Sequence, residues 1–465
     1  MPQEHTICAP ASAPGTGAIA IIRLSGPDAI TIADKVFKAS GKSGKLVYHP
    51  SNSVIVGRIK AGKELLDEVL VTVFRSPRSY TGEDTVEISC HGSPYIQTRI
   101  LQVLIKYGAT MARPGEFTQR AFLNGKMDLS QAEAVADLIA AGSEAAHRLA
   151  IDQMRGGFSE ALEELREKLL KFTSLIELEL DFADEDVEFA DRAELVKLVR
   201  EVQSKIASLT ESFQTGNAIK KGIPVAIVGE TNVGKSTLLN ALLHDDKAIV
   251  SEFHGTTRDT IEDTITLSGV TFRFIDTAGI RHTEDAIESL GIERTYKSIN
   301  KAQIILFMAD ASSPAAQINK RLEEIRRRIV AQKLIVLLNK ADTANESRLK
   351  RLKQSTKLRT GELLFIISAR KGLNIDKLEA KLVEISGLRN ISNEGVIVTN
   401  LRHYEALVKA GEAIQRAGEG LKNGISGDLL AQDIRECMHY LGEITGQIST
   451  DEILGYIFKN FCIGK

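Results

Sequence analysis

The sequence predicts a multidomain α/β and all-α protein: an amino-terminal α/β domain, a helical bundle, and a doubly wound α/β domain inserted into that bundle. The chain has 465 residues, which is enough for three domains at about 150 residues per domain. Eight of its ten prolines lie at or before Pro114, so the amino-terminal part is rich in turns and the remainder tolerates long helices. From about residue 217, a pattern of strand, loop and helix recurs several times.

Composition excludes several classes of protein. The chain carries 59 Lys and Arg against 61 Asp and Glu, a net charge of -2, so it is not a basic protein that coats nucleic acid, and any contact with nucleic acid must be local. A mean hydropathy of -0.07 without a long apolar run excludes a membrane-spanning helix. The first residues lack the pattern of a secretory or transit signal, so we expect a cytoplasmic location. The cysteines form no C-x-x-C pair, so neither disulfides nor structural zinc are expected.

Residues 1–120 are predicted to form the amino-terminal α/β domain. Apolar and β-branched runs at 18–22, 53–56 and 69–74 are bounded by Gly, Pro and Ser, which is typical of strands.

Residues 121–216 and 386–465 are predicted to be the two parts of the helical bundle. Ser130 and Glu133 fit a capping box that would begin a helix. In three later stretches, apolar residues recur three or four positions apart, which places each set on one face of a helix. These sets are Leu162, Leu165, Leu169, Phe172 and Ile176; Leu195, Leu198, Val202, Ile206, Leu209 and Phe213; and Leu430, Ile434, Cys437, Leu441 and Ile444. Each face must be buried, and we expect the two parts to pack together.

Residues 217–385 are predicted to form the inserted domain. Mostly continuous apolar strands at 225–228, 272–275, 304–307, 334–338 and 364–367 are separated by helical stretches. Such strands are typical of a parallel sheet that is covered by helices on both faces.

A phosphate-binding loop follows the first of these strands. Residues 229–236 read Gly-Glu-Thr-Asn-Val-Gly-Lys-Ser, which matches G-x-x-x-x-G-K-[ST] between a strand and a helix. In this motif the glycines let backbone N–H groups surround phosphate oxygens, the lysine reaches the β- and γ-phosphates, and the serine ligates Mg²⁺. We therefore predict nucleotide contacts from Asn232, Val233, Gly234, Lys235, Ser236 and Thr237.

Three motifs at the ends of later strands complete the predicted nucleotide site. Asp276-Thr277-Ala278-Gly279 supplies an acid for the Mg²⁺ shell and a glycine N–H for the γ-phosphate. Asn339-Lys340-Ala341-Asp342 selects the base, because the Asp342 carboxylate accepts hydrogen bonds from guanine N1–H and the exocyclic amine, a donor pair that adenine lacks. Ser368-Ala369-Arg370 is placed to support the guanine carbonyl. Because these elements in this order resemble the translation-factor-like class of GTPases, we predict GTP binding.

The motifs leave the catalytic residue open. Ile280 stands where Ras-like GTPases have a glutamine, and its side chain cannot orient water. The nearby polar candidates are Arg281, Glu284, Asp285 and Glu288. In the stretch 255–259, Thr257 is the natural second Mg²⁺ ligand, with Thr256 beside it. The Asn232 amide oxygen could ligate a monovalent cation, or the side chain could only stabilise the loop.

The complete set of motifs resembles the MnmE (TrmE) family of tRNA modification GTPases over essentially the whole chain. Three stretches outside the nucleotide site carry the resemblance: residues 81–87 (TGEDTVE), residues 113–118 (RPGEFT) continuing through 120–126 (RAFLNGK), and residues 461–465 (FCIGK). The last is the most specific, since generic GTPases do not end this way. The resemblance implies an amino-terminal domain that binds a folate and dimerises, a central helical domain and an inserted G domain.

The resemblance also implies how GTP is hydrolysed. In such a homodimer the two G domains meet across the nucleotide, and K⁺ takes the role of an arginine finger. Glu288 orients the attacking water. The implied K⁺ ligands are Asn232, Ser251, Thr256 and the backbone carbonyl of Phe253. Ser251, Thr256 and Thr257 are also implied contacts of GTP.

A second site is implied for a tetrahydrofolate derivative, in the 5,10-methylene or 5-formyl form. Its residues by resemblance are Arg23, Glu87, Lys126 and Lys465, with Cys462 as a possible modification-site thiol. The implied partner is the FAD-dependent protein MnmG (GidA), in a heterotetramer or larger complex. Together they would add an aminomethyl or carboxymethylaminomethyl group to C5 of the wobble uridine of certain tRNAs, with the folate supplying the carbon and glycine or ammonium the amine.

The motifs of the G domain by themselves are also compatible with two other functions. A ribosome-assembly or RNA-binding switch GTPase would need an appended RNA-binding module, and the sequence shows neither a KH-type G-x-x-G context nor a basic tail. A self-assembling GTPase that acts as a mechanical switch would use the helical blocks.

Overall fold

The structure is a computed structural model that describes residues 5–40, 44–181, 192–243, 263–275, 298–387, 396–448, 451–459, 461, 462 and 464. It divides into two compact units. The first comprises residues 1–139, 152–200 and 412–465, and the second comprises residues 140–151 and 201–411. Within the described residues, no helix has the length and apolar character needed to cross a membrane.

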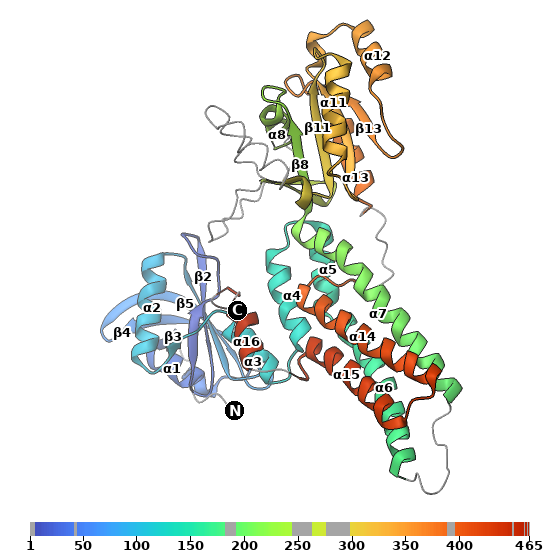
Figure 1. The fold of residues 1–465 in the computed structure, drawn as a ribbon. Coiled ribbons are helices and arrows are strands. Elements are labelled where there is room, and N and C mark those ends of the chain that lie inside the picture. The colour runs from blue at the N-terminus through green and yellow to red at the C-terminus, as the bar shows by residue number, and fades with distance from the viewer. Residues whose placement is uncertain are drawn as a thin grey trace. The chain divides into compact units, whose positions relative to one another are not determined.

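The first unit contains a seven-stranded sheet built from the amino-terminal part of the chain (Figure 1). Its strands, in the order β3-β4-β5-β6-β2-β1-β7, are antiparallel except for the β1–β7 pair. The strands are β1 (Ile7–Pro10), β2 (Ile19–Ser25), β3 (Phe37–Ala39), β4 (Ser53–Ala61), β5 (Glu64–Phe74), β6 (Thr85–His91) and β7 (Thr110–Met111). Helices α1 (Ala29–Val36) and α2 (Pro94–Lys106) cover one face, where Ile30, Ile100 and Val103 pack on the strands. The predicted α/β domain is therefore present, with α3 (Glu116–Leu123) following the sheet.

The other face of this sheet carries exposed apolar side chains. Val54, Val56, Leu70 and Ile19 are 62%, 59%, 45% and 69% exposed, and we call them the uncovered sheet face. The strand register makes the strip continuous, because Val56 pairs with Leu70, Leu70 with Ser89, and Ser89 with Ile21. In each strand these residues alternate with buried ones such as Val69 and Val71, as in a sheet packed on one side only.

Helices from two separate stretches of the sequence form the all-α part of the chain. They are α4 (Leu129–Ala140), α5 (Glu144–Met154), α6 (Gly157–Asp181), α7 (Arg192–Lys221), α14 (Leu401–Asn423), α15 (Gly427–Thr445) and α16 (Asp451–Lys459). In the first unit α6 packs along α15, where Arg166 Nε donates to Met438 O at 3.3 Å. In the second, Phe213 of α7 stacks on Tyr404 of α14 with ring centroids 4.6 Å apart. The expected packing between the two helical stretches is confirmed, and the predicted faces are buried except for the half-buried Phe172 and Phe213.

The predicted capping box at Ser130 and Glu133 is wrong. Helix α4 begins at Leu129, and the reciprocal bonds are made by Asp128 and Gln131. Asp128 Oδ1 accepts from Gln131 N, and Asp128 N donates to Gln131 Oε1, both at 2.9 Å. Asp and Gln serve this motif as well as Ser and Glu, and here the earlier pair lies at the helix start.

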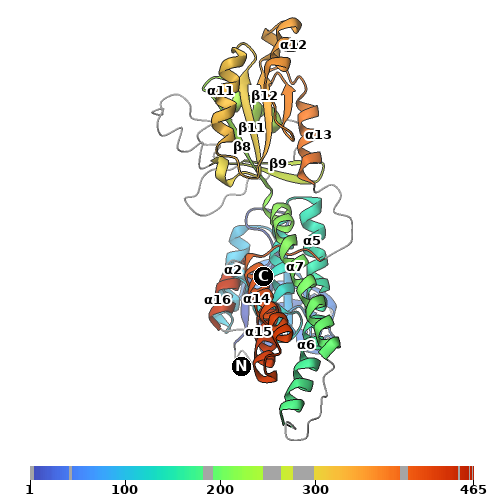
Figure 2. The ribbon, with the colours of Figure 1, turned by 45° about the vertical axis from the view of Figure 1, so that its right-hand side comes forward.

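The second unit contains the doubly wound domain, with a six-stranded sheet in the order β13-β12-β11-β8-β10-β9. Its strands are β8 (Ile223–Gly229), β9 (Asp263–Leu267), β10 (Val270–Phe274), β11 (Ile304–Asp310), β12 (Lys333–Asn339) and β13 (Leu363–Ile366). Helices α8 (Lys235–Leu243) and α13 (Ile375–Ser386) pack on one face, and α11 (Ala315–Arg326) and α12 (Glu346–Ser355) pack on the other. Figure 2 shows α11 and α13 on opposite sides of β11 and β12. The predicted fold class is confirmed.

One edge strand was not expected. β9 runs antiparallel to β10, and Ser268 and Gly269 turn the chain between them with φ of 48° and 81°. Its sequence, Asp-Thr-Ile-Thr-Leu, has only two buried residues in alternation, so it lacks the continuous apolar run of the central strands.

Candidate functional site

The phosphate-binding loop lies between β8 and α8 and fits only glycine at two positions. Gly229 has φ 157°, and a Cβ there would lie 2.4 Å from Met308 O. Gly234 has φ 97°, and its added Cβ would lie 2.4 Å from Asn339 Nδ2. Between them Asn232 has φ 62°, a left-handed conformation that asparagine tolerates better than most residues. The backbone can therefore curve tightly at this edge of the sheet, as a loop that surrounds phosphate must.

Lys235 lies across this loop. Its Nζ donates to Gly229 O at 2.8 Å and to Glu230 O at 2.7 Å, which fixes the cation beside the loop backbone. Burial lowers the pKa of Lys235. Ser236, half-buried, and Thr237, exposed, follow in the first turn of α8. The positive end of a helix and a fixed ammonium group together suit a phosphate chain.

Asn339, at the end of β12, connects two loops of the site. Its side chain is 3% exposed; Nδ2 donates to Val233 O at 2.8 Å and Oδ1 accepts from Ala369 N at 2.9 Å. The phosphate-binding loop is thus tied to the loop at 368–370. The sequence predicted Asn339 only as a contact to the nucleotide, because the motif says nothing about which loops its amide would reach.

Asp342 lies in the predicted base-binding loop. Its Oδ1 accepts a hydrogen bond from Ser368 Oγ at 2.6 Å. This hydroxyl, with the cations of Lys371 and Arg370 nearby, lowers the pKa of Asp342, so the group is an acceptor at neutral pH. Lys340, with φ 65°, directs its Nζ to Asp310 Oδ2 at 2.8 Å. Asp310 was not among the predicted residues, although it ends β11 at the same edge of the sheet.

The structure thus places twelve of the predicted nucleotide contacts at the carboxyl edge of one sheet, on its loops and in the first turn of α8. Ligands of open α/β sheets bind at that edge. The twelve are Asn232, Val233, Gly234, Lys235, Ser236, Thr237, Asn339, Lys340, Asp342, Ser368, Ala369 and Arg370. The remaining predicted residues of this site lie outside the described residues: Ser251, Phe253, Thr256, Thr257, Asp276, Thr277, Ala278, Gly279 and Glu288.

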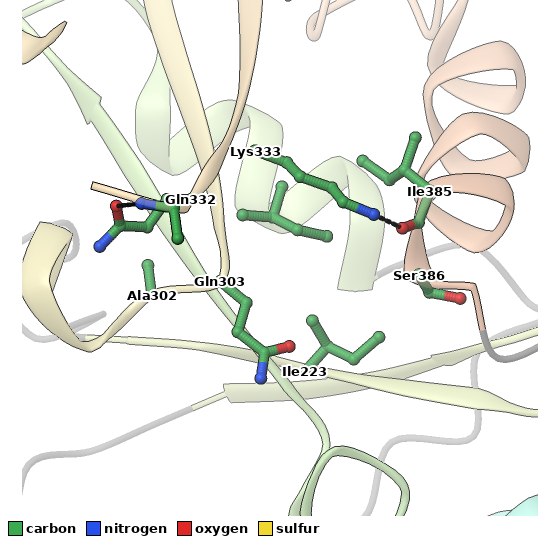
Figure 3. Close-up of a pocket in the computed structure, with 9 residues that line it drawn as sticks. Ile223, Ala302, Gln303, Gln332, Lys333, Ile385 and Ser386 are labelled. Carbon is green, nitrogen blue, oxygen red and sulfur yellow. Dashed lines mark hydrogen bonds between the residues drawn. The ribbon is translucent and has the colours of Figure 1, made fainter. Parts of the chain in front are cut away.

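A cavity of about 280 Å³ lies at the opposite, amino edge of the same sheet (Figure 3). Its lining includes the first residues of three strands, Ile223, Ile304 and Lys333. Lys333 Nζ donates across the cavity to Ile385 O. Gln332 Oε1 accepts from Val330 N at 2.8 Å. These polar groups are used within the domain, and the cavity is separate from the nucleotide loops.

Arg23 and Glu87, two of the predicted folate contacts, lie opposite each other on β2 and β6. Glu87 Oε1 accepts from Arg23 Nε at 2.9 Å and lies 2.8 Å from Nη2. The guanidinium also lies 5.4 Å from the ring centroid of Tyr80 and 5.7 Å from that of Phe117. Both residues of the pair project from the side of the sheet that bears the uncovered sheet face, because they alternate with the buried Ile22, Leu24, Val86 and Ile88.

The end of the chain reaches this pair. Arg23 Nη1 donates to Gly464 O at 3.5 Å, and Gly115 N donates to Cys462 O at 3.4 Å. Gly464 has φ 96°, and an added Cβ would lie 2.0 Å from Pro10 O, so only glycine fits there. α16, which precedes the tail, contacts α3 (Figure 1). Two of the stretches that carried the family resemblance, at 113–118 and 461–465, therefore meet in the fold.

Lys126 and Cys462 are exposed. Lys126 Nζ donates to Pro77 O at 3.1 Å and no contact joins it to Arg23, so the structure brings together only part of the predicted folate set. Lys465 lies outside the described residues. Of the four thiols, that of Cys462 is exposed, and the other three are buried. Burial raises the pKa of Cys8 and Cys90 to about 11 and that of Cys437 to about 12.

A buried ion network holds these stretches together. Arg120, 1% exposed, donates to Glu83 Oε2 and to Glu116 Oε1, both at 3.1 Å. Burial by itself would raise the pKa of Glu116, but the Arg113 N–H and the Arg120 guanidinium outweigh it and lower that pKa. The network therefore contributes stability above the pKa of an unfolded glutamate, and this is lost as the pH falls through the lowered value.

Replacing Arg120 with Met is expected to destabilise the amino-terminal domain by about 3 to 5 kcal/mol, because Glu116 would be left as a buried charge without its partner. Urea-dependent proteolysis measures the loss. Arg99→Met is the matched control: the Arg99 pair with Glu64, 2.8 Å apart, is 32% and 50% exposed and should contribute less than about 1 kcal/mol. Equal stability of the two variants would contradict the stabilising role given to the buried Arg120 network.

Comparison with known proteins covers almost the whole chain. Residues 6–126 match the family model described as GTP-binding protein TrmE N-terminus, and residues 129–462 match the model described as MnmE helical domain. A protein of Bacteroides fragilis (strain YCH46) named tRNA modification GTPase MnmE is 56% identical over 465 residues, which is 99% of this chain and 100% of that one. The chain belongs to the MnmE family of tRNA modification GTPases.

Other MnmE relatives agree. The protein of that name from Parabacteroides distasonis is 54% identical over 462 residues, 99% of this chain and 100% of that one. The one from Christiangramia forsetii is 52% identical over 476 residues, with both chains covered completely. The MnmE resemblance drawn from the motifs is confirmed, and a family of tRNA modification GTPases makes this chain a GTP hydrolase rather than a binding module.

Proposed function

We propose that the chain is a K⁺-dependent GTPase that works with an FAD-dependent partner of the MnmG (GidA) type. The pair add an aminomethyl or carboxymethylaminomethyl group to C5 of the wobble uridine of certain tRNAs. The observation that carries this proposal is the set of Lys235, Asn339 and Asp342 loops at one sheet edge, in a chain of the MnmE family. A tRNA substrate supports the expected cytoplasmic location.

At this edge GTP would lie with its phosphates on the loop at 229–236 and its guanine on Asp342. Lys235 neutralises phosphate charge, and Asn339 keeps the phosphate and base loops at a fixed separation. Ser236 and Thr257 would hold Mg²⁺, which neutralises the charge that develops on the phosphates. Ser236, a half-buried residue in the first turn of α8, suits that role.

K⁺ would sit against the phosphates on Asn232, with Ser251, the Phe253 carbonyl and Thr256 as further ligands. Asn232 has a left-handed backbone conformation in the phosphate-binding loop, where its amide oxygen could face a bound cation. Glu288 would orient the attacking water.

Replacing Glu288 with Ala is expected to abolish GTP turnover, a loss of about 10² to 10⁴, while GTP affinity stays nearly intact. Glu284→Ala, in the same segment, is the matched control and should keep its turnover. Single-turnover hydrolysis and equilibrium binding of a fluorescent GTP analogue separate the two effects. Normal turnover of the Glu288 variant would remove the assignment.

A tetrahydrofolate derivative would bind beside Arg23 and Glu87, and it would supply the one-carbon unit. The residues present suit it: Glu87 can accept from pterin N–H groups, while Lys126 and Lys465 suit the glutamate carboxylates. Tyr80 and Phe117 fix the Arg23 guanidinium, and the tail at Gly464 would close one side of the site. Cys462, exposed in that tail, is a possible modification-site thiol.

A homodimer would form through the amino-terminal domain. The uncovered sheet face offers the apolar surface, because Val54, Val56, Leu70 and Ile19 lie in one strip and are each about half exposed or more. Solvent-exposed apolar side chains in a continuous patch mark interaction surfaces. Arg23 and Glu87 lie on the same side of this sheet, so dimerisation and folate binding would share it.

Mass spectrometry of tRNA nucleosides tests the function. Cells that lack this protein should lose an aminomethyl-type C5 uridine, and cells in which it is restored should regain it. An unchanged nucleoside profile would leave a GTPase whose target is not the wobble uridine.

A further inference from the structure

The segment 343–361 is strongly basic although the whole chain is not. It holds six Lys and Arg against one Glu, a net charge of +5, whereas the whole chain has a net charge of -2. The six cations are Arg348, Lys350, Arg351, Lys353, Lys357 and Arg359. All six are exposed. A local excess of positive charge therefore lies on α12 (Glu346–Ser355), which Figure 1 labels, and on the residues that follow it.

The fold keeps these cations at the surface. α12 is anchored by Leu352, 6% exposed, and by the half-buried Leu349, both packed on the core with α11. Its start is fixed by Asn345, whose Oδ1 accepts from Arg348 N at 2.9 Å, and by Arg348 Nε, which donates to Ala311 O at 3.0 Å. The helix thus presents its remaining side chains on a rigid element.

Most of the charge in the segment is not neutralised within the domain. Among the described residues, no carboxylate lies within ion-pair distance of Lys350, Lys353 or Lys357. Of the six cations, Arg359 does pair with an acid of α11, Glu323, at 2.9 Å, and Glu323 also pairs with Arg326 at 2.7 Å. Glu324 pairs with Arg321 at 2.8 Å. Lys350 and Lys353, three positions apart on the helix, repel each other, which disfavours the folded helix unless an anion lies beside them.

The chemistry of the segment points to phosphate rather than to bases. It contains no aromatic residue and no histidine, so it offers no surface on which bases could stack. Flexible ammonium groups bind phosphate oxygens as point charges and fix position without reading sequence. We propose that α12 and residues 356–361 form a docking surface for the phosphate backbone of the tRNA substrate, which rests on the tRNA modification proposed above.

The salt dependence of tRNA binding tests this surface. The full chain carrying Lys350→Gln and Lys353→Gln is compared with the parent, using total tRNA from cells that lack the protein, at fixed K⁺ with NaCl varied. The slope of log affinity against log salt should fall by about two, and affinity at moderate salt should fall about tenfold. GTP turnover should not change, because neither lysine touches the nucleotide loops.

Lys301→Gln with Lys377→Gln is the matched control. Both lysines are exposed in the same domain, outside the segment, and remove the same charge. This control should retain the parent's slope and affinity. Equal slopes for the parent and the α12 variant would overturn the surface while leaving tRNA as a partner, and a parent that bound no tRNA would overturn both. Weakened binding of the flavin-containing partner with unchanged tRNA binding would assign α12 to an acidic protein instead.

Discussion

Asp342→Asn is expected to shift the nucleotide preference from guanine toward xanthine. The carboxylate of Asp342 is held by the Ser368 hydroxyl at 2.6 Å, and its pKa is lowered, so it presents acceptors only. Asparagine would replace one acceptor with an N–H donor, which faces the guanine amine unfavourably and suits the xanthine carbonyl. One hydrogen bond to a charged acceptor is lost in this way, so GTP binding should weaken about 10- to 10²-fold.

Competition between fluorescent GDP and XDP measures this shift. Asp376→Asn, an exposed aspartate in the first turn of α13, is the matched control and should leave the preference unchanged. Ser368 can still donate to the amide oxygen of the variant, so the loop should keep its shape. Unchanged guanine selectivity in the Asp342 variant would mean that another group reads the base.

Replacing K⁺ with Na⁺ at equal ionic strength is expected to slow GTP turnover by about 10³ or more, because the cation takes the place of an arginine finger, which is worth about 10³ to 10⁵. GTP affinity should change little, since Lys235 and the backbone of the loop still hold the phosphates. Turnover measured against K⁺ concentration, with choline balancing the ionic strength, gives the effect. Equal rates in the two cations would end the K⁺ proposal.

A variant at Asn232 decides between its two interpretations. Asn232→Gly keeps the left-handed backbone, which has φ 62°, but removes the amide oxygen. If the amide ligates K⁺, this variant should lose the stimulation by K⁺ and keep its GTP affinity. Stimulation that survives the change would show that Asn232 only shapes the loop.

Local sequence patterns predicted the elements whose signal is contained in a short stretch. The five mostly continuous apolar runs, the phosphate-loop motif and the one-faced helices each follow from residue types and their spacing, and the structure contains them. β9 was missed because an edge strand that is half buried and five residues long resembles a loop. The capping box was misplaced by two residues because Ser, Asp, Glu and Gln all satisfy the motif.

Contacts between distant residues could not be predicted in this way. The Arg120 pair with Glu83 joins residues 37 positions apart, and the Arg23 bond to Gly464 joins residues 441 apart. Nothing in the local sequence around either residue identifies its partner. Asn339 is similar, since its motif fixes the residue type and only the fold shows that it holds two loops at once.

The cavity at the amino edge of the doubly wound sheet also shows how that domain is joined to the rest of the chain. Ile223 begins β8, Ser386 ends α13, and both line this one cavity, so the chain enters and leaves the domain at neighbouring points. Closing the remaining chain over that short gap costs little loop entropy. The whole nucleotide-binding module could therefore be removed or exchanged with a short linker in its place, which makes its insertion into a helical bundle a small structural change for the host fold.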